Sequence, residues 1–240
     1  MSRRNLLIGG ALALAWVIGA PRLIRLTQDE FPFEDMPGLP GFRSLGFGGG
    51  GANIALLGIG EGEAPGPNPL GSNPCAAIFG DGDDRLPVAV FTDYFCPYCP
   101  EVSELVRRLD RAGEVRAVWR EWPVLGPRSE AMARVALAAA AQGAHDAAHA
   151  YLMRNALRPG PAALAEFAER FGLDAGLLAR DAQSGEVQAR IEATRALAKR
   201  LGLPGTPGLA IGRTLTAGRM PEARLRRLIE LERERPACTA

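Results

Sequence analysis

The chain has 240 residues, of which 47% are apolar and 23% are charged, with 28 Lys and Arg against 27 Asp and Glu. A chain of this length can bury a sizeable core, in one domain with an insertion or in two small domains. The net charge near +1 excludes a strongly basic surface, so we expect no nucleic-acid partner.

The first 26 residues differ from the rest of the chain. Arg3 and Arg4 precede an apolar run at residues 6–20, which is the pattern of a secretory signal. Residues 2–7 (SRRNLL) also resemble a twin-arginine export signal. We interpret residues 1–26 as a signal that is removed or as an inner-membrane anchor through residues 6–26, with a buried N-terminal helix as the alternative. Both export interpretations place the remaining chain in the periplasm or cell envelope.

Residues 27–74 are rich in Gly and Pro, with a glycine run at 48–51 and the sequence GEAPGPNPLGSNP at 62–74. Such composition holds little regular structure, so we interpret this segment as an extension or linker. It is either a spacer that lifts the domain from the membrane or an extension along the domain surface. The second option is favoured by four phenylalanines that a free linker does not need: Phe31, Phe33, Phe42 and Phe47.

The folded domain is expected over residues 75–240. Residues 88–91 form a short apolar run that predicts a buried strand. A helix follows to about Asp110, with apolar side chains at helical spacing, and a second strand is predicted at 115–121. Strand, helix and strand in this order form a parallel crossover unit.

A helical block is predicted next, at about residues 128–201. Ser129 can cap an alanine-rich helix that ends at Gly143. Later helices are predicted at residues 145–157, 161–171, 174–180 and 184–201. Strands return at residues 208–212 and 214–216 across a hairpin turn, and Pro221 begins a last helix. The outline is βαβ, an all-helical insertion, then ββα.

The segment Cys96-Pro97-Tyr98-Cys99 places two cysteines in the first turn of a helix, directly after a strand. Unpaired N–H groups and the dipole at a helix N-terminus stabilise a thiolate. A thiolate attacks a disulfide, and a second cysteine three residues later resolves the mixed disulfide. Cys96 is therefore predicted as the nucleophile and Cys99 as the resolving thiol, with Pro97 and Tyr98 between them.

A second motif, Gly205-Thr206-Pro207-Gly208, lies directly before the returning strand. Thioredoxin-like folds place a cis proline at this point, beside the redox pair. Thr206 and Pro207 are therefore predicted to meet an extended substrate, with Thr206 exposing its backbone. An ordinary loop proline is the alternative, since most X-Pro bonds are trans.

The chain resembles the DsbA family of cell-envelope thiol–disulfide oxidoreductases over roughly residues 86–234. The resemblance is carried by residues 91–99 (FTDYFCPYC), 121–130 (EWPVLGPRSE) and 205–207 (GTP). It implies an α/β thioredoxin-like fold with a helical insertion. It also implies a Cys96–Cys99 disulfide that is donated to exported cysteine-containing polypeptides, and a membrane partner that reoxidises the pair. We expect no cofactor.

Two residues depart from the family pattern. Val90 stands where many relatives carry a Glu that assists proton transfer, although Asp93 is close. Pro100 stands where relatives commonly have Lys or Arg. Losing these groups weakens the expectation of a strongly oxidising protein. A disulfide reductase or isomerase of the same fold, and a thiolate-based metal-handling or assembly factor, stay open as alternatives.

Two further residue pairs are singled out. Cys75 and Cys238 flank the domain, and we predict a structural disulfide between them. A second, exposed redox pair and a free thiol that links to a partner are the alternatives. His145 and His149 share one helical face, a spacing that can bind metal. They lack the Glu of a zincin motif, so we predict a solvated helix face and no metal site.

Overall fold

The computed structural model describes residues 31–46, 68–158 and 160–238. The predicted export segment at residues 1–26 lies outside the described residues, as does much of the Gly- and Pro-rich segment. Contacts within the chain define two units, residues 1–33 and residues 34–240. The description below concerns the second unit.

A six-stranded sheet has the order β1-β2-β6-β5-β3-β4. β3 pairs in parallel with β4 and antiparallel with β5, and β5 pairs antiparallel with β6. Every residue of β3 is buried, as expected for a central strand covered on both faces. The strands are β1 (Phe33–Asp35), β2 (Arg43–Leu45), β3 (Pro87–Thr92), β4 (Arg116–Glu121), β5 (Gly208–Ile211) and β6 (Thr214–Ala217).

The predicted helices occur in the predicted order, which confirms the α/β thioredoxin-like fold with a helical insertion between its two halves. A further helix, α2, precedes β3 and was not predicted. One helix is shorter than predicted: α5 ends at Leu152, with Met153 as its C-cap. The helices are α2 (Pro74–Phe79), α3 (Cys99–Arg111), α4 (Pro127–Ala141), α5 (His145–Leu152), α6 (Pro161–Phe171), α7 (Ala175–Asp181), α8 (Gly185–Arg200) and α9 (Glu222–Arg233).

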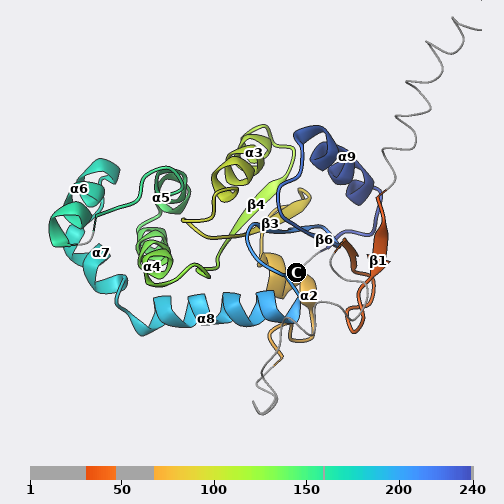
Figure 1. Ribbon diagram of the computed structural model, residues 1–240, viewed down its shortest axis with the longest axis horizontal. Coiled ribbons are helices and arrows are strands. Elements are labelled where there is room, and N and C mark those ends of the chain that lie inside the picture. Colours follow the sequence, from red (N-terminus) through yellow and green to blue (C-terminus); the bar gives the residue numbers. More distant parts are fainter. Residues whose placement is uncertain (1–30, 47–67, 159, 239–240) are drawn as a thin grey trace, which may run out of the picture. The chain divides into compact units, whose positions relative to one another are not determined.

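Helices cover both faces of the sheet. Ala89 and Phe91 of β3 belong to a core cluster with residues of α2 and α8. Because side chains alternate along a strand, Val88, Val90 and Thr92 point to the opposite face, where α3 contacts β3 and β4. Figure 1 shows α3 and α9 together on one side of the strands, and α8 and α2 on the other.

The helical insertion packs against the start of α3. Helices α4, α5, α6 and α7 contact one another, and α8 runs back from this block to β4 (Figure 1). Their apolar side chains form a second core cluster, which includes Cys96 and Cys99. The apolar side chains of the insertion therefore cover the two cysteines of the redox motif.

The chain before residue 75 contributes to the sheet. β2 pairs in parallel with β6, with Arg43 opposite Thr214. The Arg43 guanidinium lies 2.8 Å from the buried Glu232 carboxylate of α9, to which the Thr214 hydroxyl donates at 2.6 Å. Residues 43–45 thus belong to the sheet, whereas the sequence placed the start of the domain near residue 75.

A disulfide joins Cys75 in α2 to Cys238 after α9, with the two Cα atoms 5.3 Å apart and a sequence separation of 163. Both cysteines are buried in the core cluster that α2 shares with α8. The bond closes the C-terminal tail onto the helix that precedes β3.

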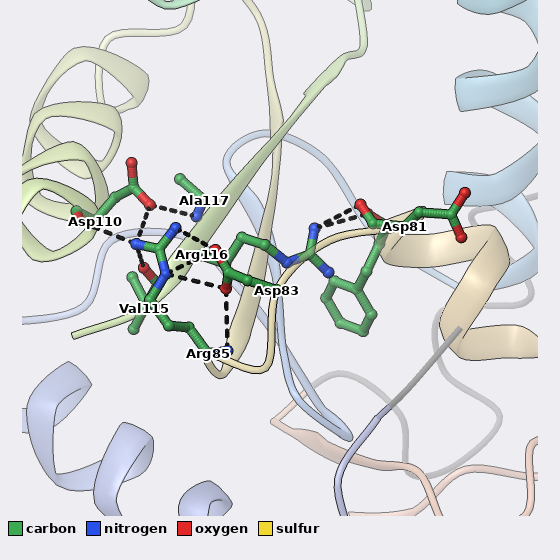
Figure 2. Close-up of polar contacts among 8 residues, drawn as sticks. Asp81, Asp83, Arg85, Asp110, Val115, Arg116 and Ala117 are labelled. Carbon is green, nitrogen blue, oxygen red and sulfur yellow. Dashed lines mark hydrogen bonds and ion pairs between the residues drawn. The ribbon is translucent and has the colours of Figure 1, made fainter. Parts of the chain in front are cut away.

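Arg85 fixes the end of α3 to the start of β4, far along the helix from the redox motif. Figure 2 shows its guanidinium between Asp83 and Asp110, with Nη1 donating to the Val115 carbonyl at 2.8 Å. The Asp110 carboxylate also accepts from the Ala117 N–H at 3.2 Å. Because α3 is held at this end, its N-terminal turn has a defined position over the sheet.

Candidate active site

Cys96 and Cys99 lie where β3 ends and α3 begins. β3 ends at Thr92, the Cys96 N–H donates to the Asp93 carbonyl at 3.2 Å, and α3 starts at Cys99. Both cysteines are free thiols in this structure. Cys96 is 4% exposed and Cys99 is fully buried, so the Cys96 sulfur lies nearer to the surface.

The Thr206–Pro207 loop meets the redox pair. The peptide bond between these residues is cis, and the Cys96 thiol donates to the Thr206 carbonyl at 3.3 Å. Gly208 follows at the start of β5, where a Cβ atom would come within 2.9 Å of the Leu203 side chain. The structure therefore brings together the two motifs that the sequence singles out, although 110 residues separate Cys96 from Thr206.

The Cys99 thiol is held neutral by its surroundings. Burial raises the pKa of Cys99 to about 12, outweighing the opposite effect of hydrogen bonds from the Asp93 backbone and the Thr92 side chain. The neighbouring Cys96 side chain also raises the pKa of Cys99. The buried Cys99 thiol therefore keeps its proton.

Asp93 fixes the loop that carries the redox motif. One carboxylate oxygen accepts from the Phe95 N–H and the Ser129 hydroxyl, each at 2.8 Å. The other accepts from the Val124 and Leu125 N–H groups at 2.8 and 3.0 Å. The carboxylate is thus fully engaged in joining β3 to residues 123–129, and its role here is structural.

Replacing Asp93 by Asn should lower the free energy of unfolding by about 3 kcal/mol, because an amide offers one acceptor oxygen and leaves buried donors unpaired. Chemical denaturation measures the difference. The exposed Asp84, three residues before β3 begins at Pro87, provides the control, and Asp84→Asn should change the free energy by less than about 0.5 kcal/mol. Equal stability of the two variants would contradict the structural role of Asp93.

His149 corrects the prediction of a solvated helix face. It is 0% exposed, and its Nδ1 atom lies 3.0 Å from the Glu121 carboxylate. His145, which is partly exposed, reaches the same carboxylate oxygen at 3.1 Å. The prediction was wrong because it assumed that a polar side chain on a helix faces the solvent. Here the Glu121 carboxylate from β4 compensates the cost of burying the imidazole.

Glu121 is buried and ionised. Burial alone would raise the pKa of this carboxyl, but the two histidines outweigh that effect and lower its pKa to about 2. The Tyr94 hydroxyl lies 3.2 Å from His149 Nδ1, and the pKa of Tyr94 is well above its usual range because of burial and the Glu121 charge. Trp119 stacks on the His149 ring at 4.3 Å between centroids.

Sequence reasoning missed this buried cluster, although one signal was present. His149 lies three residues before Leu152 and four before Met153, which are both buried, so it belongs to the apolar stripe of its helix. A histidine on such a stripe needs a buried partner.

Comparison with known proteins adds a second line of evidence. The profile of the DSBA-like thioredoxin domain matches residues 87–230, which is more than half of the chain and includes both motifs of the site. This chain belongs to the DSBA-like thioredoxin domain family. It is therefore a thiol–disulfide oxidoreductase with a CxxC pair.

Solved structures of DsbA-like and thioredoxin-like proteins resemble the chain. A thioredoxin-like oxidoreductase from Silicibacter pomeroyi is 35% identical over 66% of this chain and 91% of its own, with a TM-score of 0.58. The thiol-disulfide exchange protein α-DsbA2 from Wolbachia pipientis is 22% identical over 64% and 84%, with a TM-score of 0.58. The catalytic domain of Proteus mirabilis ScsC is 21% identical over 65% and 93%, with a TM-score of 0.57.

This chain matches only a small part of one curated relative. Na(+)/H(+) antiporter NhaA 3 from Salinispora tropica is 38% identical over 99 residues, which make up 39% of this chain. The match spans 15% of the antiporter's length. Among the described residues of the DsbA-like chain, no helix has both the length and the apolar composition that crossing a bilayer requires.

The two departures of this DsbA-like chain lie close to the cysteines. Val90 is fully buried on the face of β3 that α3 covers, opposite Trp119 in the register of β4. Pro100 occupies the first turn of α3, where its missing N–H costs no helical hydrogen bond. The Glu and the basic residue of many relatives are therefore replaced by groups that carry no charge.

Proposed function

We propose that this chain is a thiol–disulfide oxidase that donates the Cys96–Cys99 disulfide to exported cysteine-containing polypeptides. A substrate thiolate attacks the Cys96 sulfur, the S–S bond breaks, and Cys99 leaves with the bonding electrons and takes up a proton. A second substrate thiolate then attacks the substrate sulfur and releases Cys96 as a thiolate. The substrate has lost two electrons, and the protein has gained them.

The observation that carries this proposal is the arrangement of the reduced pair. The Cys96 thiol donates to the Thr206 carbonyl at 3.3 Å, and Cys96 precedes the N-terminal end of α3. Only the reduced thiol can donate this hydrogen bond, so the bond favours the reduced form over the disulfide. A dithiol whose reduced form is stabilised is a strong oxidant, because donating its disulfide is then favourable.

The surface around the site suits an unfolded polypeptide. Tyr98 is 53% exposed, and Val124 and Leu125 are exposed on the segment that Asp93 holds against the motif. With the Thr206 carbonyl beside Cys96, these side chains offer backbone and apolar contacts to an extended chain. Such contacts select for exposed apolar segments around a cysteine rather than for one sequence.

The equilibrium constant of the Cys96–Cys99 pair with glutathione tests the direction. We expect a reduction potential more positive than about −200 mV, on the oxidising side of the glutaredoxins. A more negative value would favour a reductase, since every 30 mV corresponds to about 1.4 kcal/mol for this two-electron couple. A pair of Cys96→Ser and Cys99→Ser variants, which form no intramolecular disulfide, gives the baseline for the thiol assay.

Location and reoxidation belong to the same proposal. The signal-like pattern of residues 1–26 supports export, with the domain acting in the periplasm or cell envelope. An oxidase must pass its two electrons to an acceptor after each cycle, so we infer a redox partner at the membrane. Mass spectrometry of the protein from its native envelope measures whether residues 1–26 are retained as an anchor.

A further inference from the structure

A buried polar cluster covers the face of the sheet on which Cys99 lies. Thr92 of β3 and Glu121 of β4 are paired in register, so their side chains point to the same face, toward α3. The Thr92 hydroxyl donates to the Met153 sulfur at 3.9 Å, and the Thr92 side chain partly offsets the rise that burial causes in the pKa of Cys99. Glu121 thus stands on the sheet directly beside a residue that affects the buried cysteine.

His149 links the Glu121 carboxylate to the helix that carries Cys99. Its Nδ1 atom lies 3.0 Å from Glu121 Oε1, and its Nε2 atom lies 3.3 Å from the Ser103 hydroxyl of α3. Because the carboxylate accepts the Nδ1 proton, Nε2 is the nitrogen that exchanges a proton with Ser103. Ser103 follows Cys99 by one helical turn, which places their Cβ atoms about 5–6 Å apart on one buried face.

Stability alone is a poor reason to keep this cluster. A buried ion pair is often no better than apolar residues of the same volume, because both charges lose their water. The second oxygen of Glu121, Oε2, is buried and has no hydrogen-bond partner among the described residues. Buried polar atoms without a partner are rare in proteins and ask for a functional explanation.

Cys99 needs a proton carrier at this place. The thiol has no access to water, and burial raises its pKa to about 12, yet it must become a thiolate whenever the disulfide forms. Val90 stands on β3 where many relatives carry a Glu, and its side chain cannot carry a proton. The Asp93 carboxylate already accepts hydrogen bonds from four donors.

We propose that His149, oriented by Glu121, exchanges a proton with Cys99 through the Ser103 hydroxyl. When a thiolate attacks Cys96 and the Cys96–Cys99 bond breaks, Cys99 takes the Ser103 proton, and Ser103 takes the Nε2 proton of the imidazolium. When the disulfide forms, Cys99 returns the proton along the same path and its sulfur attacks Cys96. The inference rests on the thiol–disulfide exchange proposed above, in either direction.

The surroundings of His149 contain few other groups that titrate. They come from every element packed against it: Glu121 from β4, Tyr94 after β3, His145 on α5 itself and Cys99 on α3. At the outer ends of α3 and α5, Arg111 and Asp146 form an ion pair at 3.8 Å with both side chains more than half exposed. The pH dependence of the exchange step therefore reports on the Glu121–His149 pair.

Oxidation of the reduced protein by glutathione disulfide tests the proposal. Quenched flow with thiol alkylation counts the mixed disulfide on Cys96 separately from the Cys96–Cys99 disulfide between pH 6 and 9. In His149→Asn the amide can still donate to Glu121 but carries no proton. We expect conversion of the mixed disulfide to slow by about 100-fold or more at pH 6–7, the scale of general base catalysis, and its rate to rise about tenfold per pH unit.

Three comparisons make the result decisive. Ser103→Ala keeps the Glu121–His149 pair and should show the same slow, hydroxide-dependent conversion, so it decides the matter if His149→Asn does not fold. His145→Asn removes the other imidazole at Glu121. The described contacts of His145 do not include Ser103, so this variant should keep the wild-type pH profile. Formation of the mixed disulfide, which needs no proton from Cys99, should be unchanged in all three.

Wild-type conversion rates and pH profiles in folded His149→Asn and Ser103→Ala would overturn the proton path. That outcome is distinct from failure of the oxidase proposal, which would appear as a reducing potential of the wild-type pair with glutathione.

Discussion

Replacing Cys96 by serine is expected to abolish the exchange of disulfides with a reduced polypeptide. The Cys96 sulfur is the less buried of the pair and lies 3.3 Å from the Thr206 carbonyl, where a substrate chain would pass. A hydroxyl does not form a stable mixed disulfide, so neither direction of exchange can proceed. Loss of a nucleophile of this kind costs at least about 10³-fold in rate. Oxidative refolding of a reduced multi-disulfide protein measures it.

The matched variant is Cys99→Ser, which keeps the reacting sulfur and removes the buried thiol. It should accumulate a mixed disulfide between Cys96 and the substrate, visible as a reducible band on a non-reducing gel. The roles of the two cysteines would have to be exchanged if Cys99→Ser lost all reaction and Cys96→Ser trapped the substrate instead.

Removing the Cys75–Cys238 bond by the double change to alanine is expected to lower the free energy of unfolding by about 2–5 kcal/mol. The upper value follows from chain entropy, since the sequence separation of the cysteines is 163. The loss arises mainly because the unfolded chain is no longer closed into a loop. Denaturant titration in a Cys96→Ser/Cys99→Ser background isolates this bond from the redox pair.

Reductant supplies the control for this prediction. Adding dithiothreitol should destabilise the protein that retains Cys75 and Cys238 by a similar amount and leave the alanine variant unchanged. Exchange activity of a Cys75→Ala/Cys238→Ala variant that keeps Cys96 and Cys99 should stay near wild type below its unfolding midpoint, because the bond lies on the face of the sheet opposite α3. Equal stability with and without the bond would contradict its structural role.

The local elements of this protein are determined by the sequence itself. The apolar run of β3 and the helical spacing in α3 and α8 predict these elements because backbone geometry repeats every two or 3.6 residues. Cys96 and Cys99 could be assigned as the redox pair because the sequence predicts a strand directly before them and a helix directly after them. The β2 strand escaped prediction because three residues in a Gly-rich segment carry no period of their own.

The tertiary structure decided what each site residue meets. The sequence predicts both cysteines in the first turn of a helix, whereas α3 begins at Cys99 and Cys96 lies three residues before it. Only the packing of β5 beside β3 brings the Thr206 carbonyl to 3.3 Å from Cys96. The largest difference between the sequence-based prediction and the structure concerns His149. Helical periodicity identifies it only as a polar residue on a helix. Its burial depends on Glu121 from β4, Tyr94 after β3 and Ser103 from α3. A charge or imidazole can leave water only when partners from other elements surround it, and those partners are set by the fold rather than by neighbours in the chain.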